Sequence, residues 1–122
     1  MYPPSLPHDV KARAFRASNG ELGILPADAA VFLAACRSDD VEVLGWELWV
    51  ANHGWDFENN VPVPAQGVWC GGIPVNDADV PAVIGGEGDA DEIERQLAAT
   101  DLDKEVQAAW LPHVRVNFTL DG

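Results

Sequence analysis

The sequence is poor in cysteine and has no long apolar run. Its two cysteines, Cys36 and Cys70, form no CxxC motif, whereas small secreted domains that depend on disulfides carry more cysteines. No stretch approaches the roughly 20 consecutive apolar residues that span a bilayer. The first nine residues contain three prolines but neither the basic start nor the apolar stretch of a signal peptide. These absences predict a cytoplasmic protein with free thiols.

Basic residues are also scarce. Seven Lys and Arg stand against 20 Asp and Glu, so the formal net charge is −13. A field of this sign repels nucleic acid and anionic membrane surfaces, and it attracts basic proteins. We therefore expect a basic protein as the partner, and neither nucleic acid nor a membrane. Acidity that serves only to keep the protein soluble is the alternative interpretation.

The acidic residues are concentrated in one segment. Between Asp77 and Glu105 there are ten acids and two basic residues, which gives this segment a charge of −8. Before residue 38 the charges nearly balance. One end or face of the folded protein is therefore expected to be distinctly acidic.

The length of the chain, 122 residues, fits a single domain. A chain of this size buries roughly 65% of its surface on folding, and its hydrophobic fraction of 48% is typical of a globular protein. The early prolines predict an extended arm over residues 1–9. One domain is expected to follow over residues 10–122.

A helix is predicted to begin at Pro26. Proline suits the first turn of a helix, because its missing N–H would have no partner there. The next apolar residues fall at the spacing of one helical stripe. This stripe consists of Ala29, Phe32, Leu33 and Cys36.

Residues 41–50 predict a central strand. Their second face is mixed rather than polar, which favours a central strand with part of its second face covered. Gly45 is expected to mark a β-bulge or the close approach of a neighbour. The face predicted to point into the core consists of Leu44, Trp46, Leu48 and Val50.

The segments before this helix and after this strand have less regular patterns. Residues 10–25 predict a β-hairpin around Asn19-Gly20, and a short helix over residues 10–17 is the alternative. Residues 51–65 are rich in turn formers and predict a surface loop. A short strand is expected over residues 66–75.

The last third of the chain predicts two helices and a strand. Asp89 and the glutamate three residues later form a helix cap, and a second helix is expected from about Asp101 until Pro112 stops it. Residues 114–120 alternate as a strand with one buried face. Together these elements predict a single-domain α+β fold, with a mixed, mostly antiparallel sheet and about three helices packed on one face.

No group of polar residues predicts catalysis or a bound cofactor. His53, Asp56 and Glu58 are close in the chain, but no rigid element would preset them as metal ligands. Two Asp-x-Asp patterns lack the Gly and Glu that a calcium loop needs at positions six and twelve. The glycine-rich segment 85–88 is too acidic to hold phosphate, and it predicts a flexible turn. We expect no metal, no cofactor and no catalytic residue.

The aromatic residues indicate an interface. Five tryptophans exceed what one small core readily hides. Trp46 and Trp110 fall on apolar faces and are expected in the core, whereas exposed tryptophan among acids is typical of hot spots that face Arg or Lys. Burial of all five, with satisfied indole N–H groups, is the alternative. The residues predicted to bind the partner are Glu47, Trp49, Trp55, Phe57, Asp77, Asp79, Glu87, Asp89, Asp91, Glu92 and Glu94.

A capped helix that runs into the strand Leu44-Gly45-Trp46-Glu47-Leu48-Trp49 resembles some small bacterial immunity proteins of toxin–antitoxin or contact-inhibition systems. The resemblance covers residues 26–50. It implies a cytoplasmic protein that occludes a toxin, often a basic nuclease, with an acidic and aromatic face. These families share no functional residues, so the resemblance assigns no individual site.

The expected function is therefore that of an acidic protein-binding module without enzymatic activity, an immunity or inhibitor protein that neutralises a basic toxin or nuclease by occlusion. A small enzyme that uses Cys70 or His53 is one alternative. A structural accessory protein that forms a homodimer through its tryptophan-bearing face is the other.

Overall fold

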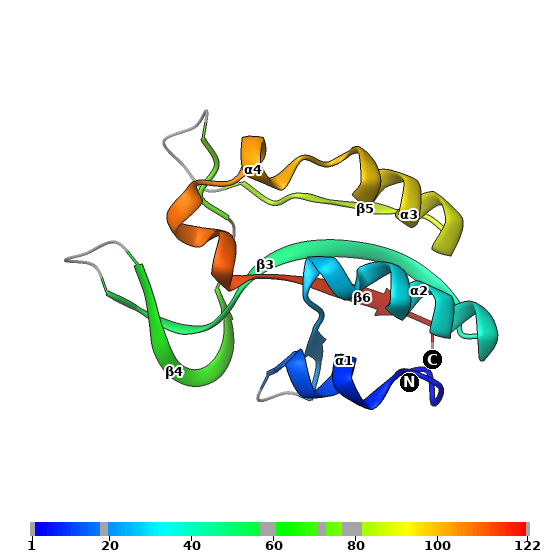
Figure 1. Ribbon diagram of the computed structural model, residues 1–122. Helices are drawn as coiled ribbons and strands as arrows, with labels where there is room; N and C mark the ends of the chain where they lie inside the picture. Colours follow the sequence, from blue (N-terminus) through cyan, green and yellow to red (C-terminus); the bar gives the residue numbers. More distant parts are fainter. Residues whose placement is uncertain (1, 18–19, 57–60, 71–72, 77–81, 122) are drawn as a thin grey trace.

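The computed structural model (Figure 1) describes the backbone of residues 2–17, 20–56, 61–70, 73–76 and 82–121, and the side chains of these residues outside 51–70. Among the described residues, no helix has the length and apolarity that a membrane crossing requires. The elements form an α+β fold with an antiparallel sheet, as the sequence predicts.

The sheet is built around one long strand. All strand pairs are antiparallel, and Val50 of the long strand pairs with Cys70 on one edge and with Val114 on the other. The predicted central position of residues 41–50 is therefore confirmed. The strands of this sheet are β3 (Val43–Asp56), β4 (Val61–Cys70), β5 (Gly85–Glu87) and β6 (Val114–Leu120).

The N-terminal segment contains both of the elements that the sequence offers as alternatives. A helix, α1 (His8–Arg13), is followed by a hairpin of β1 (Phe15–Arg16) and β2 (Leu22–Gly23). Beyond the hairpin, the backbone N–H and C=O of Ile24 bond to Val116 at 2.8 and 2.7 Å. The hairpin is a separate two-stranded sheet, and the residue that follows it is bridged to β6.

The predicted helix over residues 26–37 is confirmed as a 3-10 turn, η1 (Pro26–Asp28), that runs into α2 (Ala29–Ser38). All four residues of its predicted apolar stripe are buried. Phe32 stacks on Phe118 of β6 with ring centroids 4.5 Å apart. This contact fixes α2 on one face of the sheet.

Helix α3 (Ala90–Ala99) lies on the same face (Figure 1). Its predicted cap is present, since Asp89 Oδ1 accepts a hydrogen bond from the Glu92 backbone N–H at 2.9 Å. Gln96 ties the helix to the sheet: its Oε1 accepts from Trp46 Nε1 at 2.7 Å, and its Nε2 donates to the Glu87 carbonyl at 3.0 Å. The indole of Trp46 is therefore buried with its polar atom satisfied.

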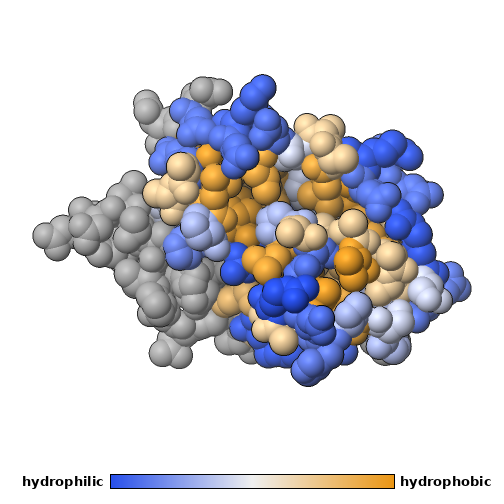
Figure 2. Space-filling model, viewed as in Figure 1, coloured by the Kyte–Doolittle hydropathy of each residue, from blue (hydrophilic) through white to orange (hydrophobic). Residues whose placement is uncertain are grey.

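In the described part of the chain, helices pack on one face of the sheet and leave the other without a helix (Figure 1). Six buried residues of the two central strands form the packed face, and Figure 2 shows the outer side of the helices that cover it, where hydrophilic side chains surround a hydrophobic centre. On the opposite face, the side chains of β3 and β6 are exposed or half-buried. We call this second surface the open face. The buried six are Trp46, Leu48, Val50, Val114, Val116 and Phe118.

One predicted core residue lies outside the core. Leu44 is 43% exposed, whereas its neighbour Val43 is only 3% exposed. The register of β3 on β6 shifts by one residue between Val43 and Gly45, and such a bulge reverses which side chains face inward. A Cβ on Gly45 would also lie 3.0 Å from the Gly86 carbonyl oxygen. Both predicted roles of Gly45, a bulge and a close neighbour, are therefore present.

The prediction of a surface loop over residues 51–65 is wrong. β3 continues to Asp56 and β4 begins at Val61, and the two strands form a curved hairpin that extends away from the helices (Figure 1). Pro62 and Pro64 lie in β4. Proline is compatible with an edge strand such as β4, where one side of the backbone needs no ladder hydrogen bond.

The predicted helix from Asp101 to Pro112 is interrupted. It divides into α4 (Leu102–Glu105) and a 3-10 helix, η2 (Ala108–His113), which includes Pro112 rather than ending before it. The break occurs because Val106 is extended and pairs with Val75. With η1 and α2 taken as one, the described residues contain five helical segments rather than about three.

Candidate binding groove on the open face

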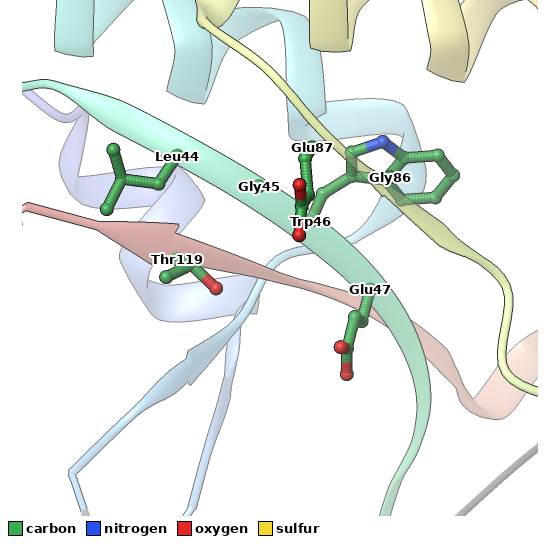
Figure 3. A pocket seen from close by; sticks show the side chains of 7 residues that line it. All are labelled: Leu44, Gly45, Trp46, Glu47, Gly86, Glu87 and Thr119. Carbon is green, nitrogen blue, oxygen red and sulfur yellow. The ribbon is translucent and has the colours of Figure 1, made fainter.

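A hollow of about 320 Å³ lies on the sheet where β5, β3 and β6 run side by side (Figure 3). A second hollow of about 250 Å³ shares four of its lining residues and extends to Val83 beyond β5. We call the two together the acidic groove. Its lining residues are Leu44, Gly45, Trp46, Glu47, Val83, Gly85, Gly86, Glu87 and Thr119.

Glycines create the hollow. Gly45 pairs with Glu87 on one side and with Thr119 on the other, so a residue without a side chain lies between two residues that have one. In β5, a Cβ on Gly85 would overlap the Trp46 carbonyl oxygen, and one on Gly86 would overlap Gln96 Oε1. The prediction of a flexible turn over residues 85–88 is therefore wrong, because residues 85–87 form a strand whose glycines allow close approach to β3 and α3.

Two glutamates give the groove its charge. Glu47 pairs with Gly85, and Glu87 pairs with Gly45, so the two glutamates are diagonal neighbours on the ladder. Diagonal neighbours on one sheet face have Cβ atoms about 7 Å apart. Both side chains are exposed, and neither has an ion-pair partner among the described residues. The groove therefore carries two carboxylates whose charge no basic residue of this part of the chain neutralises.

Arg115 is a basic residue of the open face, and its guanidinium group bonds to backbone carbonyls. Arg115 lies two residues before Asn117, which pairs with Glu47. Its Nη1 donates to the carbonyls of Pro112 and Val114, both at 2.9 Å, and burial lowers the pKa of Arg115. The guanidinium therefore serves the turn before β6 and leaves the groove acidic.

Exposed apolar side chains lie at two ends of the groove. Leu44 is 43% exposed and Val83 is 68% exposed. With Val31 of α2, they are the large hydrophobic residues that the described part of the chain leaves most open to solvent. Apolar side chains beside a charged centre are typical of protein-binding surfaces.

The remaining predicted acids of the described residues belong to α3 and already have roles within the chain. Asp91 Oδ1 accepts from Arg37 Nη2 at 2.8 Å, and Glu94 lies 3.5 Å from Arg37 Nη1, which links α3 to α2. The hydrogen bond to Asp91 raises the pKa of Arg37. Glu92 pairs with Arg95 at 2.8 Å. These carboxylates, together with the cap Asp89, are partly neutralised before any partner arrives.

The predicted aromatic anchors divide into three groups. Trp46 and Trp110 are 3% and 1% exposed, so their prediction as core residues is confirmed. Trp49 is half-buried on the open face, opposite Arg115. The side chains of Trp55, Phe57 and Trp69, and those of Asp77 and Asp79, lie outside the described residues, so their predicted exposure and binding stay predictions.

The side chain of one cysteine is described, and it belongs to the core. Cys36 is fully buried, and this burial, assisted by Asp39, raises the pKa of its thiol to about 11. No group of three or more metal-binding side chains occurs in the described part of the chain. The side chains of Cys70 and of the His53, Asp56 and Glu58 set lie outside it.

We expect native Cys36 to react very slowly with a thiol reagent. Its pKa of about 11, against an ordinary value of 9.0, lowers the thiolate fraction near neutral pH by about 100-fold, and burial slows the reaction further. The measurement is the rate of reaction with Ellman's reagent in a Cys70→Ser variant, which isolates Cys36. The same variant in denaturant is the control. Equal rates in the folded and the denatured protein would contradict the buried position.

Most of the groove was not among the predicted site residues. Only Glu47 and Glu87 were, and they lie 40 positions apart in the sequence. The sequence pattern predicts Leu44 in the core and the glycines of β5 in a turn. The one signal for this site was Gly45, whose predicted bulge is the feature that exposes Leu44.

Comparisons of the chain with models of known families, with curated proteins and with solved structures gave no match. The resemblance of residues 26–50 to immunity proteins therefore stays a prediction.

Proposed function

We propose that this protein is a binding module that recognises a basic protein through the acidic groove and the surrounding open face. The observation that supports this most is the groove itself: two carboxylates that form no ion pair with any described residue, beside exposed Leu44 and Val83, on a sheet face that the described helices do not cover. An interface needs desolvated apolar contacts and complementary charge, and this surface offers both.

The charge of the whole chain supports the same function. A net charge of −13 attracts a basic partner over roughly one Debye length, about 10 Å at moderate salt. Together with the resemblance of residues 26–50, this favours a cytoplasmic immunity or inhibitor protein that occludes a basic toxin or nuclease. The partner's own site would be covered, and no chemistry on this chain would be needed.

The groove offers little for catalysis. Among the described residues that line it, the side chains with charged or hydroxyl groups are two glutamates and Thr119, and none is a histidine or a cysteine. A carboxylate pair can cleave glycosides when one member is held in a desolvated site as a general acid. Glu47 and Glu87 are both exposed. Binding is therefore the function that this geometry favours.

The test is capture of a partner in the cytoplasm and its dependence on salt. We expect a tagged protein to retain one stoichiometric basic protein at low salt, with an association rate that falls at least about tenfold between about 50 and 500 mM NaCl. The double variant Glu47→Gln/Glu87→Gln should lose most of this dependence. The matched control is Asp101→Asn/Asp103→Asn, which removes the same charge from exposed positions outside the groove.

Two results would contradict the proposal. One is a captured partner that is acidic or whose association rate is independent of salt. The other is an equal loss of association in the groove variant and in the control variant, since general acidity rather than the groove would then carry the binding.

A further inference from the structure

We propose that the acidic groove receives an arginine side chain of the partner, presented by a segment with apolar residues beside it. This inference rests on the proposed function and names the chemistry of the group that is bound. It depends on the arrangement of the two glutamates, the glycine floor and the exposed apolar ends.

The number and arrangement of its donors favour arginine over lysine. Glu47 and Glu87 are diagonal neighbours with Cβ atoms about 7 Å apart, so both carboxylates can approach one cationic group between them. A guanidinium group is planar and carries five N–H donors that point in different directions. It can therefore donate to both carboxylates at once, as charge-assisted hydrogen bonds require.

The floor and the ends of the groove suit the rest of an arginine side chain. Gly45 has no side chain and lies between Thr119 and Glu87 on the ladder, so the space between those two side chains can take a methylene stem. Arginine places its stem on apolar surface while its head group contacts charge or water, and Leu44 provides such a surface. Val83, at 68% exposed, is left for an apolar neighbour of the arginine.

The hollow is large enough to receive one side chain. Its volume of about 320 Å³ lies at the lower end of the roughly 300–1,000 Å³ that small-molecule pockets occupy. Figure 3 shows the side chains of Leu44, Glu47 and Thr119, from β3 and β6, beside this hollow. An arginine that the partner protein positions can bind in a shallow hollow, because the partner's own surface covers it.

The test uses a small probe and does not depend on identifying the partner. The ¹⁵N-labelled protein is titrated with N-acetyl-L-arginine amide and, separately, with the citrulline analogue, which has nearly the same shape without the charge. We expect the amide signals of Gly45, Gly86 and Glu87 to shift towards saturation in the millimolar range with the arginine probe. The citrulline probe should bind at least about fivefold more weakly, since charge-assisted hydrogen bonds are roughly twice as strong as neutral ones.

Variants make the result specific to the groove. Glu47→Gln/Glu87→Gln should abolish the shifts, and Asp101→Asn/Asp103→Asn should leave them unchanged. Unchanged spectra away from the groove show that each variant is folded. The lysine analogue, N-acetyl-L-lysine amide, should shift the same signals with at least about threefold weaker affinity, because an ammonium group has three donors and no planar fork, whereas a guanidinium group has five donors in a fixed plane.

The inference is overturned if arginine and citrulline probes give equal shifts, if lysine binds as well as arginine, or if the groove variant and the control variant respond alike. Its failure is separable from failure of the proposed function. A salt-dependent basic partner combined with no arginine effect refutes only this inference, whereas probe binding without any captured partner refutes only the proposed function.

Discussion

Replacement of Phe32 by alanine is expected to lower the free energy of unfolding by about 3–5 kcal/mol, the usual cost of a buried aromatic truncated to alanine. Phe32 is fully buried in α2. Its ring stacks on Phe118 at 4.5 Å and meets Tyr2 edge-on at 6.2 Å. The substitution therefore removes the contact between the helix layer, the sheet and the N-terminal segment at once.

Urea unfolding followed by tryptophan fluorescence measures this loss. The control is Val31→Ala, the preceding residue on the same helix, which is 42% exposed and should change stability by no more than about 0.5 kcal/mol. The total stability of a domain this size is about 5–15 kcal/mol, so Phe32→Ala is expected to leave a marginal fold. A loss below about 1 kcal/mol would show that α2 is not packed on Phe118.

Replacement of Gly85 by alanine is expected to cost about 3 kcal/mol, at the upper end of what overpacking usually costs. The new Cβ would overlap the Trp46 carbonyl oxygen and lie 3.1 Å from the Cα of Glu47. These obstructing atoms belong to the backbone of the central strand, so no change of side-chain rotamer can relieve the overlap. The edge β5 should separate from β3, and the acidic groove should lose its β5 side.

Gly86→Ala provides the comparison, because its main obstruction is a side chain. The Cβ would overlap Gln96 Oε1 and lie 3.0 Å from Trp46 Nε1. Gln96→Ala in the same chain should therefore relieve part of the strain of Gly86→Ala and none of that of Gly85→Ala. Unfolding free energies of the two double variants measure this difference. Similar relief in both would contradict the described packing of β5 between β3 and α3.

The elements that sequence predicts best are those whose local pattern and burial agree. The stripe that contains Phe32 is buried throughout, and residues 114–120 form β6 with alternate side chains inside. Asp89 caps α3 as its spacing predicts. In these segments no long-range contact competes with the local preference, so the pattern alone is sufficient.

Prediction fails where a distant partner decides the conformation. Val106 leaves a helical pattern because Val75, 31 positions earlier in the chain, pairs with it. Pro62 and Pro64 suggest a loop, yet the register of β4 on β3 accommodates them at an edge. Neither the pairing of Val106 with Val75 nor that of β4 with β3 can be predicted from local sequence, because each depends on a strand partner that the tertiary fold supplies.

The candidate site illustrates the same limit for charge. Counting acids along the chain directs attention to α3, where Asp91, Glu92 and Glu94 are dense. The structure shows that each of these has an arginine nearby. The two acids of the groove come from different strands and are conspicuous only because their neighbours on the ladder are glycines.

Because of the bulge at Leu44, the insertion or deletion of a single residue in β3 would change the shape of the groove. β3 holds one residue more than β6 between Val43 and Gly45. Deletion of Leu44 would allow regular pairing there, with every residue from Gly45 onward keeping its place and Val43 still facing inward. The groove would lose its apolar end while the central strand, the helices and the hydrophobic core persisted. Natural variation in this surface could therefore arise through insertion and deletion as readily as through substitution, and at little cost to folding.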